Sequence, residues 1–322
     1  MLPGFYPALF PFALLLAGSA QDVLPTPDPS VADPTTLALT EVSERMTVPV
    51  QIAGAGPYRF IIDTGSERTV ISRQLATRLG LAEGNMVNVV AMSGVSRVGT
   101  VLIPSLSLSS VPSIGVIHAP ALDANHLGGM GLLGIDTLQN HRITIDFEAG
   151  TMSVAPAVKR QRSEPRESGE IVVRARSLFG QLIVTDADVD GRQVRVVLDT
   201  GSPVSIGNAA LRRLLTRHSG KLEPLVMTSA TGGEVHTQYT RVDKLRVGGI
   251  EFKGMPIAFA DVAPFERLGL DKKPAMLLGM NAMKFFRRVE IDFPNREVRF
   301  KMPRGGRVTY RCLASNNQGC TA

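Results

Sequence analysis

The chain contains no tryptophan, and aromatic residues make up only 5% of its 322 positions. Proteins stack nucleic-acid bases and sugar rings on aromatic side chains, so this scarcity disfavours a nucleic-acid partner or a carbohydrate substrate. Charged residues reach 20% and hydrophobic residues 44%, which is typical of a globular protein rather than a disordered one. The chain is too long to fold around one ordinary hydrophobic core, so we expect two domains of moderate size.

Cysteine is nearly absent as well. The two that occur, Cys312 and Cys320, lie close together in the tail over 304–322, and no CxxC motif is present. Redox catalysis is therefore disfavoured. In an oxidising compartment we expect one local disulfide between them that closes a short loop.

Motifs for metal, nucleotide or serine chemistry are also missing. The glycine-rich run LGGMGLLG lacks the lysine of a phosphate-binding loop, and no GxSxG motif occurs. The histidines show no HExxH or similar ligand spacing, so we expect neither a metal ion nor a cofactor. The five histidines are His118, His126, His141, His218 and His236.

The first 20 residues carry no charged side chain, and they end in small residues with Ala20 as a plausible cleavage point. This pattern predicts a signal peptide, hence export to the periplasm or outside the cell and no stable membrane insertion after cleavage. An uncleaved membrane tether is the alternative, which Pro7 and Pro11 disfavour because they interrupt a spanning helix. Ser19 stands where a lipoprotein signal needs cysteine, so we do not expect a lipid anchor.

The net charge of +6 does not form a nucleic-acid surface. The densest basic run, 159–170, is interrupted by three glutamates. We interpret 157–170 as a solvated charged linker between two folded parts, with attraction to an anionic envelope surface as the alternative.

An internal repeat is the strongest pattern in the chain. FIIDTGSERTVIS at 60–72 returns as VVLDTGSPVSIGN at 196–208, and the two aspartates are 199 − 63 = 136 positions apart. Each copy follows a strand, a glycine-containing turn and a second strand, and each precedes a short helix-like stretch, 73–81 or 209–217.

The likeness continues beyond the repeat. LLGIDTLQNHRITIDF begins at Leu132 and LLGMNAMKFFRRVEIDF at Leu277, and each predicts a strand end, a short helix and a closing hairpin. Between these landmarks, hairpins are expected to turn at Ser93–Gly94 and Gly232–Gly233. We therefore predict two similar, mostly β lobes over 40–156 and 171–303, preceded by a Pro-rich spacer at 21–39.

An ionised aspartate after a buried strand is costly unless something pairs with it or donates hydrogen bonds to it. A single Asp-Thr-Gly-Ser turn could be an ordinary Asx turn. Two copies in pseudo-symmetric lobes predict that Asp63 and Asp199 meet at a two-fold axis and share one proton. One carboxyl group could then activate water while the other donates a proton to a carbonyl oxygen.

The duplicated DTGS loops, each followed by an apolar-apolar-Gly element, resemble those of the aspartic peptidases. Because the spacing is compact and each lobe carries its own flap hairpin, the closer resemblance is to retropepsin-like proteases, here with both lobes fused in one chain. The resemblance covers about 40–303. It implies two β-barrel lobes with a cleft between them, a protein or peptide substrate, and a monomer as the active unit.

By position, the resemblance makes Asp63 and Asp199 the catalytic pair. It makes Thr64 and Thr200 the residues that interlock the loops. The resemblance further implies that Gly65 and Gly201 are the turn glycines. It implies that the hydroxyls of Ser66 and Ser202 hydrogen-bond a catalytic carboxylate, and that Gly134 and Gly279 belong to the element packed behind each loop.

The sequence departs from the pepsin-like pattern in two places. Pro203 follows the second DTGS, which predicts a slightly different loop, and neither flap has an obvious flap tyrosine. Tyr239 lies on the return strand of the second flap, where we expect it to pack. Two other functions stay open: a catalytically inactive peptide-binding protein of the same fold, and a glycosidase built on a carboxylate pair, which would want aromatic platforms and a wider carboxylate separation.

Overall fold

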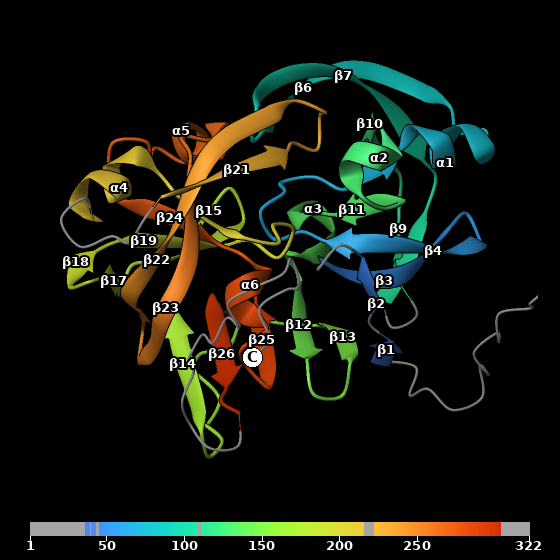
Figure 1. The fold of residues 1–322 in the computed structure, drawn as a ribbon. Coiled ribbons are helices and arrows are strands. Elements are labelled where there is room, and N and C mark those ends of the chain that lie inside the picture. The colour runs from blue at the N-terminus through green and yellow to red at the C-terminus, as the bar shows by residue number, and fades with distance from the viewer. Residues whose placement is uncertain (1–35, 39, 43–44, 109–110, 216–221, 304–322) are drawn as a thin grey trace, which may run out of the picture. The chain divides into compact units, whose positions relative to one another are not determined.

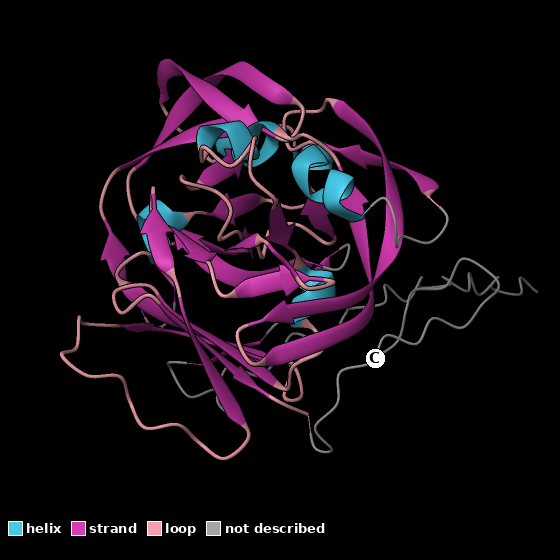
Figure 2. Cartoon of the chain, turned by 90° about the vertical axis from the view of Figure 1, so that its left-hand side faces the viewer, coloured by secondary structure: helices cyan, strands magenta, loops and turns pink. Residues whose placement is uncertain are grey.

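The computed structural model describes residues 36–303, except 39, 43–44, 109–110 and 216–221. The predicted signal peptide and the cysteine-containing tail lie outside the described residues. The Pro-rich spacer falls there too, apart from a short strand at its end. Strands predominate, joined by loops and a few short helices (Figure 2). None of the described helices has the length and apolar character of a membrane span.

The first lobe is built on one ten-stranded sheet with the order β6-β7-β10-β5-β11-β4-β3-β8-β9, in which β2 pairs with β3 (Figure 1). Its strands are β2 (Thr40–Val42), β3 (Arg45–Ile52), β4 (Ala55–Ile62), β5 (Val70–Ser72), β6 (Glu83–Ala91), β7 (Gly94–Ile103), β8 (Leu106–Leu108), β9 (Val111–Ile114), β10 (Ile117–Leu122) and β11 (Gly131–Leu133). Its helices are α1 (Arg73–Arg78), α2 (Ala124–Leu127) and α3 (Ile135–Leu138).

The second lobe repeats this topology in the order β15-β16-β19-β24-β20-β23-β22-β17-β18, with β21 pairing β22. Its strands are β15 (Arg176–Leu178), β16 (Gln181–Val184), β17 (Ala187–Val189), β18 (Arg192–Gln193), β19 (Arg195–Leu198), β20 (Ser205–Gly207), β21 (Glu223–Thr228), β22 (Glu234–Val247), β23 (Ile250–Phe259) and β24 (Ala275–Leu278). Its helices are α4 (Ala209–Leu215), α5 (Ala263–Arg267) and α6 (Met280–Met283).

These sheets confirm the prediction of a mostly β chain with two similar lobes. The described strands of each sheet run from one edge strand to another, so neither sheet is a closed barrel. The edge strands are β6 and β9 in the first sheet and β15 and β18 in the second. The outer strands of the two predicted flaps, β6 and β21, each pair on one side only among the described strands.

The central strands explain the apolar runs that precede each DTGS motif. Phe60, Ile61 and Ile62 at the end of β4 are completely buried, as are Val196 and Val197 in β19. Strands covered on both faces lose the alternation of polar and apolar residues and become continuously hydrophobic. The burial of these strands fixes where each chain emerges into the DTGS loop.

The closing hairpins of the two lobes join in a third, shared sheet instead of completing their own lobes. Its order is β1-β13-β12-β25-β26-β14. Its strands are β1 (Thr36–Ala38), β12 (His141–Asp146), β13 (Thr151–Pro156), β14 (Glu170–Arg174), β25 (Arg288–Asp292) and β26 (Glu297–Lys301).

The shared sheet also locates the pseudo-two-fold axis. The IDF segments that start at Ile145 and Ile291 are 146 positions apart, and the same offset relates Thr144 to Glu290. In the β12–β25 pair, Thr144 lies directly opposite Glu290. A residue that faces its own repeat partner marks the axis, so the two lobes are related by a rotation through this sheet.

The linker over 157–170 is more strongly held than the solvated segment that the sequence predicts. Arg160 pairs with the fully buried Asp292 at 2.7 Å, and Arg299 pairs with Glu170 at 3.0 Å where both side chains are about 4% exposed. Burying charges is tolerated when they are paired and hydrogen-bonded. The interrupting glutamates of the basic run therefore help to bind the linker to the shared sheet.

Candidate active site at the lobe junction

The two aspartates occupy equivalent places, one residue beyond the central strand of each lobe. The Asp63 N–H donates to the carbonyl of Leu133 at 3.0 Å, and the Asp199 N–H donates to that of Leu278 at 3.1 Å. Strands β11 and β24, which supply these carbonyls, run parallel to β4 and β19. Each aspartate is thus held at the carboxyl end of two buried strands.

Two buried threonines lock the loops together. The Thr64 N–H donates to Thr200 Oγ1, and the Thr200 N–H donates to Thr64 Oγ1, each at 3.1 Å. Each hydroxyl also donates across the junction, from Thr64 to the carbonyl of Leu198 at 2.9 Å and from Thr200 to that of Ile62 at 2.8 Å. The network is nearly symmetric and joins the two lobes directly beneath the aspartates.

The turn glycines bring each carboxyl group against the opposite loop. A Cβ on Gly65 would lie 2.7 Å from the carboxyl carbon of Asp199, and a Cβ on Gly201 would overlap the carboxyl group of Asp63. Neither glycine is required for a left-handed backbone, so close approach is the reason for its place here. Each carboxyl group therefore lies against the turn glycine of the opposite loop.

Backbone amides donate to the carboxylates, whereas the serine hydroxyls do not take the predicted role. Gly65 N–H donates to Asp63 Oδ1 at 2.9 Å, and Gly201 and Ser202 N–H donate to Asp199 Oδ1 at 3.0 and 3.1 Å. The hydroxyl groups turn back to carbonyls two residues on. Ser66 Oγ bonds the carbonyl of Arg68 and Ser202 Oγ that of Val204, because these local partners lie within each turn.

Gly134 and Gly279 let a second element pack tightly behind each loop. A Cβ on Gly134 would overlap the backbone of Arg68, and one on Gly279 would lie 2.5 Å from the carbonyl oxygen of Val204. The following residues bond to the loops, since the Met280 N–H donates to the carbonyl of Ser202 at 2.9 Å.

Pro203 does not alter the pairing of its loop. Its carbonyl accepts from the Asn281 N–H at 3.1 Å, just as the carbonyl of Glu67 accepts from Asp136 in the first lobe at 3.3 Å. The loop containing proline therefore keeps the same contact with the element behind it.

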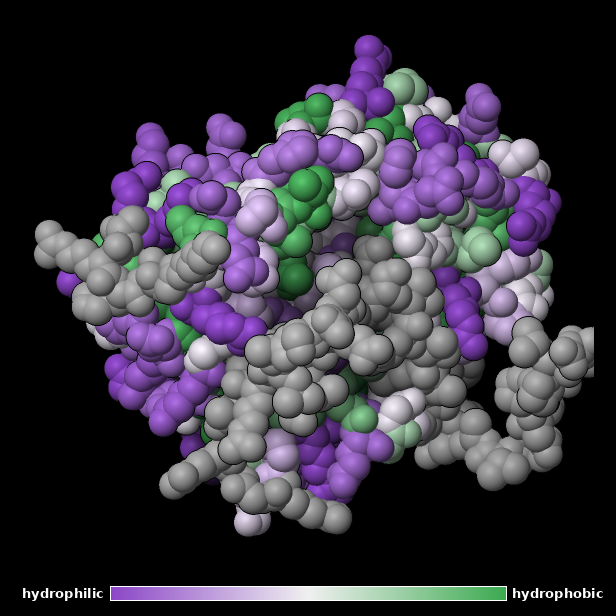
Figure 3. Space-filling view, viewed as in Figure 1, coloured by the Kyte–Doolittle hydropathy of each residue, from purple (hydrophilic) through white to green (hydrophobic). Residues whose placement is uncertain are grey.

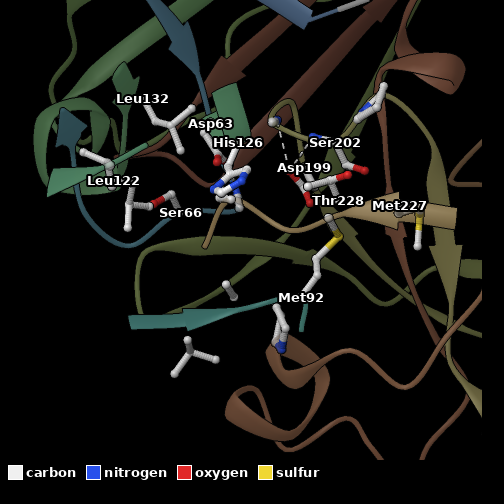
Figure 4. A pocket seen from close by; sticks show the side chains of 18 of the residues that line it. Asp63, Ser66, Met92, Leu122, His126, Leu132, Asp199, Ser202, Met227 and Thr228 are labelled. Carbon is white, nitrogen blue, oxygen red and sulfur yellow. Dashed lines mark hydrogen bonds between the residues drawn. The ribbon is translucent and has the colours of Figure 1, made fainter. Parts of the chain in front are cut away.

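A cavity of about 360 Å³ lies over both aspartates, and it is walled by the two flaps and both DTGS loops (Figure 4). Figure 3 shows a hollow in one face of the molecule, with hydrophobic side chains beside it. Most of the lining is apolar. These apolar residues are Val70, Val89, Val90, Ala91, Met92, Leu122, Leu132, Pro203, Val204, Leu225, Val226, Met227, Ala230 and Pro264.

Family models agree with this geometry in both lobes. Residues 48–140 match the model of a gag-polyprotein putative aspartyl protease, and residues 185–282 match that of an aspartyl protease. The chain belongs to the retropepsin-like aspartic peptidase family. Each matched range contains one DTGS loop and the glycine element behind it. No curated protein matches the sequence.

The flaps of this peptidase-family chain are closed over the cavity and touch at their tips. Ser93 N–H donates to Ser229 Oγ at 3.4 Å, and these two serines are repeat partners 136 positions apart. Each tip packs on the other lobe: Met92 contacts the apolar cluster around Phe265, and Ala230 contacts the cluster around Leu127.

Sequence reasoning missed several residues of this cavity. His126 was considered only as a metal ligand, yet it lines the cavity and a Cβ on the flap-tip Gly232 would lie 2.5 Å from its ring. The only signal in the sequence that could have indicated a role for His126 was its place shortly before the LLG segment that begins at Leu132. The described residues contain no cluster of acidic, histidine or cysteine side chains that could hold a metal ion.

Tyr239 is not among the residues that line the cavity. Its hydroxyl donates to Glu223 on the neighbouring strand of the same flap, and this hydrogen bond raises the pKa of the tyrosine. The contact joins the two strands of the second flap. It is consistent with the packing role that the sequence predicts.

Proposed function

We propose that the chain is an aspartic endopeptidase that hydrolyses peptide bonds with a dyad formed by Asp63 and Asp199. The observation that carries this proposal is the crossed packing of the two carboxyl groups, each against the turn glycine of the other loop. Two carboxyl groups so placed cannot both ionise easily, so the pair holds one proton over a wide pH range.

The shared proton supplies both parts of the reaction. The ionised carboxylate takes a proton from a water molecule, and the oxygen of that water attacks the carbonyl carbon of the peptide bond. The protonated partner donates to the carbonyl oxygen, giving a tetrahedral intermediate without a covalent bond to the protein. Breakdown of this intermediate moves a proton to the leaving nitrogen and breaks the C–N bond.

The main-chain amides that follow the two aspartates donate to different acceptors. The Ser202 amide donates to the carboxylate of Asp199, whereas the Ser66 amide donates to the main-chain carbonyl of Asp63 at 3.3 Å. Hydrogen bonds from amides favour the ionised form. These amide donors support an ionised carboxylate within the pair. Because the donors favour ionisation, activity should be higher in mildly acidic than in alkaline buffer.

One chain supplies both loops, so the active unit should be a monomer with a protein or peptide substrate and no cofactor. The apolar lining of the cavity favours hydrophobic side chains around the bond that is cut. The N-terminal pattern supports an exported protein, in the periplasm or outside the cell, and N-terminal sequencing of the protein produced in cells tests cleavage after Ala20.

The direct test incubates the purified chain with a diverse peptide library and identifies cleavage sites by mass spectrometry. Cleavage is expected in acidic buffer, blocked by a statine-type inhibitor and absent in the Asp199→Asn variant. A folded wild-type chain that binds peptides and cuts none under any of these conditions would contradict the proposal. It would instead support an inactive peptide-binding protein of this fold.

A further inference from the structure

A second cavity of about 300 Å³ adjoins the one over the aspartates on the side of the first DTGS loop. It lies between that loop, strand β6 of the first flap and helix α5 of the second lobe. The two cavities share six lining residues, so a peptide over the aspartates can extend a neighbouring side chain into the second one. The shared residues are Gly65, Ser66, Val70, Val89, Val90 and Pro264.

Gln181 gives this second cavity an unusual polar wall. It begins β16 of the second lobe, and its Nε2 reaches across to donate to the carbonyl of Gly65 in the first lobe. The residue is only 5% exposed. Its Oε1 is buried and has no hydrogen-bond partner in the described part of the chain. A buried acceptor without a donor is costly, and a ligand that supplies one would relieve that cost.

The remaining polar groups of the cavity carry a net positive charge. Arg267 donates to both carboxylate oxygens of Glu67, at 3.0 and 3.3 Å, and its guanidinium lies 4.1 Å from the centre of the Phe179 ring. Arg68 is exposed and makes no ion pair among the described residues. The rim of the cavity therefore holds two guanidinium groups and one carboxylate, and its net charge is positive.

We propose that this cavity is a specificity subsite for the side-chain amide of a substrate glutamine or asparagine. The amide NH₂ donates to Gln181 Oε1, and the amide oxygen accepts from the guanidinium groups at the rim. Gln181 Oε1 is buried in this structure and strand β6 contacts helix α5, so we expect the side chain to enter when β6 lifts from α5 to admit the peptide. This inference rests on the proposed peptidase function and names its preferred substrates.

Other side chains fit these groups less well. A lysine or arginine would meet the positive charge of the rim, and a carboxylate would face Glu67 and the lone pairs of Gln181. An aliphatic side chain would leave Gln181 Oε1 unpaired. Polar sites built for a hydrogen bond reject analogues that lack it much more strongly than apolar pockets reject size differences.

The second lobe does not offer the same chemistry at the related positions. Pro203 and Val204 stand where the first lobe has Glu67 and Arg68, 136 positions earlier. The cleft is therefore polar on one side and apolar on the other. This asymmetry selects one direction for the peptide chain and places the amide residue on a fixed side of the cut.

The test begins with the cleavage sites from the peptide library, aligned to find the position that contacts the second cavity. Peptides that differ only there, carrying Gln, Asn, Leu, Glu or Lys, are then compared by kcat/KM. Glutamine or asparagine should exceed leucine by about tenfold or more. Equal values for Gln and Leu, or a preference for Glu or Lys, would overturn the proposal.

The Gln181→Met variant removes the amide and keeps a side chain of similar length. Its kcat/KM is expected to fall for every peptide, because Gly65 loses a donor, but the ratio of Gln to Leu should approach one. Val204→Ala, on the apolar side of the cleft, is the matched control and should keep the wild-type ratio. A ratio unchanged in Gln181→Met would contradict the subsite.

A binding measurement separates this inference from the proposed function. Calorimetric titration of the Asp199→Asn variant with the Gln and Leu peptides does not depend on turnover. Tighter binding of the Gln peptide supports the subsite even if no peptide is ever cut, and equal binding overturns it. Absence of cleavage in the wild-type chain would overturn the peptidase function alone.

Discussion

The two lobes share a loop of the same sequence but surround it differently. Asp, Thr and Gly occupy matching positions, and their contacts across the junction are nearly the same in both directions, as a two-fold rotation requires. Beyond the serine the loops diverge, with Glu67 and Arg68 in the first lobe and Pro203 and Val204 in the second. The comparison separates the residues that hold the two aspartates together from the residues that line the cavities beside them.

Fusion of both lobes in one chain permits this divergence. In a dimer of identical chains, any change on one side of the cleft appears on the other. Here the charged pair between Glu67 and Arg267 occurs on one side only. The shared functions keep the repeat symmetric at the aspartates, and the flanking positions are free to differ.

The largest loss of activity is expected from changes at the turn glycines, which are equivalent in the two lobes. Gly201→Ala places a methyl group in the position of the Asp63 carboxyl group, and Gly65→Ala does the same to Asp199. Either change should displace one carboxyl group and lower kcat by roughly 100-fold or more. Gly115→Ala is the control, because a Cβ there meets no atom within 4 Å. Similar activity in all three variants would show that the carboxyl groups need not be so close.

The interlocking threonines should affect stability, and by similar amounts in the two lobes. Thr64→Val or Thr200→Val leaves a buried amide and a buried carbonyl without their partner, which should cost about 1–3 kcal/mol in the free energy of unfolding. Denaturant unfolding measures the cost, with Thr151→Val in β13 as control. A loss of stability in only one of the two variants would show that the junction is less symmetric than its hydrogen bonds indicate.

A smaller effect, on the pH dependence of stability, is expected at Glu290, which lies at the axis of the shared sheet. Burial raises the pKa of Glu290 above its ordinary value of 4.5, with Arg142 and Arg299 opposing the shift. The folded protein then holds this proton more tightly than the unfolded chain. The associated stability is present below about pH 4.5 and is lost as pH rises through the folded pKa.

Glu290→Gln, which is neutral at all pH values, should therefore raise Tm at pH 7 by a few degrees and leave it nearly unchanged in acid. The pKa of His141 is lowered by burial, but its titration contributes equally to both proteins and cancels in the comparison. A lower Tm for Glu290→Gln at pH 7 would mean that the pairing with arginine outweighs burial.

The parts of this structure that the sequence predicts are those set by short segments. The buried strand, the turn and the aspartate lie within about 13 residues, so Asp63 and Asp199 could be identified from the repeat. The turns at the flap tips and the helices α1 and α4 were predicted for the same reason, although α1 ends at Arg78, earlier than the predicted end.

The parts that were missed depend on distant partners. The hairpins of the shared sheet were predicted, but nothing local indicates that β12 pairs with β25 of the other lobe. Gln181 belongs to no motif, and its contact with Gly65 exists only once the lobes are assembled. The serine hydroxyls were assigned by resemblance, and the carbonyls two residues on compete successfully for them.

The central claim is that Asp63 and Asp199 of one chain act as a single unit. The most direct test measures kcat/KM for Asp63→Asn, Asp199→Asn, the double variant, and an equimolar mixture of the two single variants. Each single variant should lose several orders of magnitude, the double should be little worse, and the mixture should stay inactive, because neither carboxyl group works alone. Near wild-type turnover by a folded single variant, or activity regained on mixing, would contradict the account.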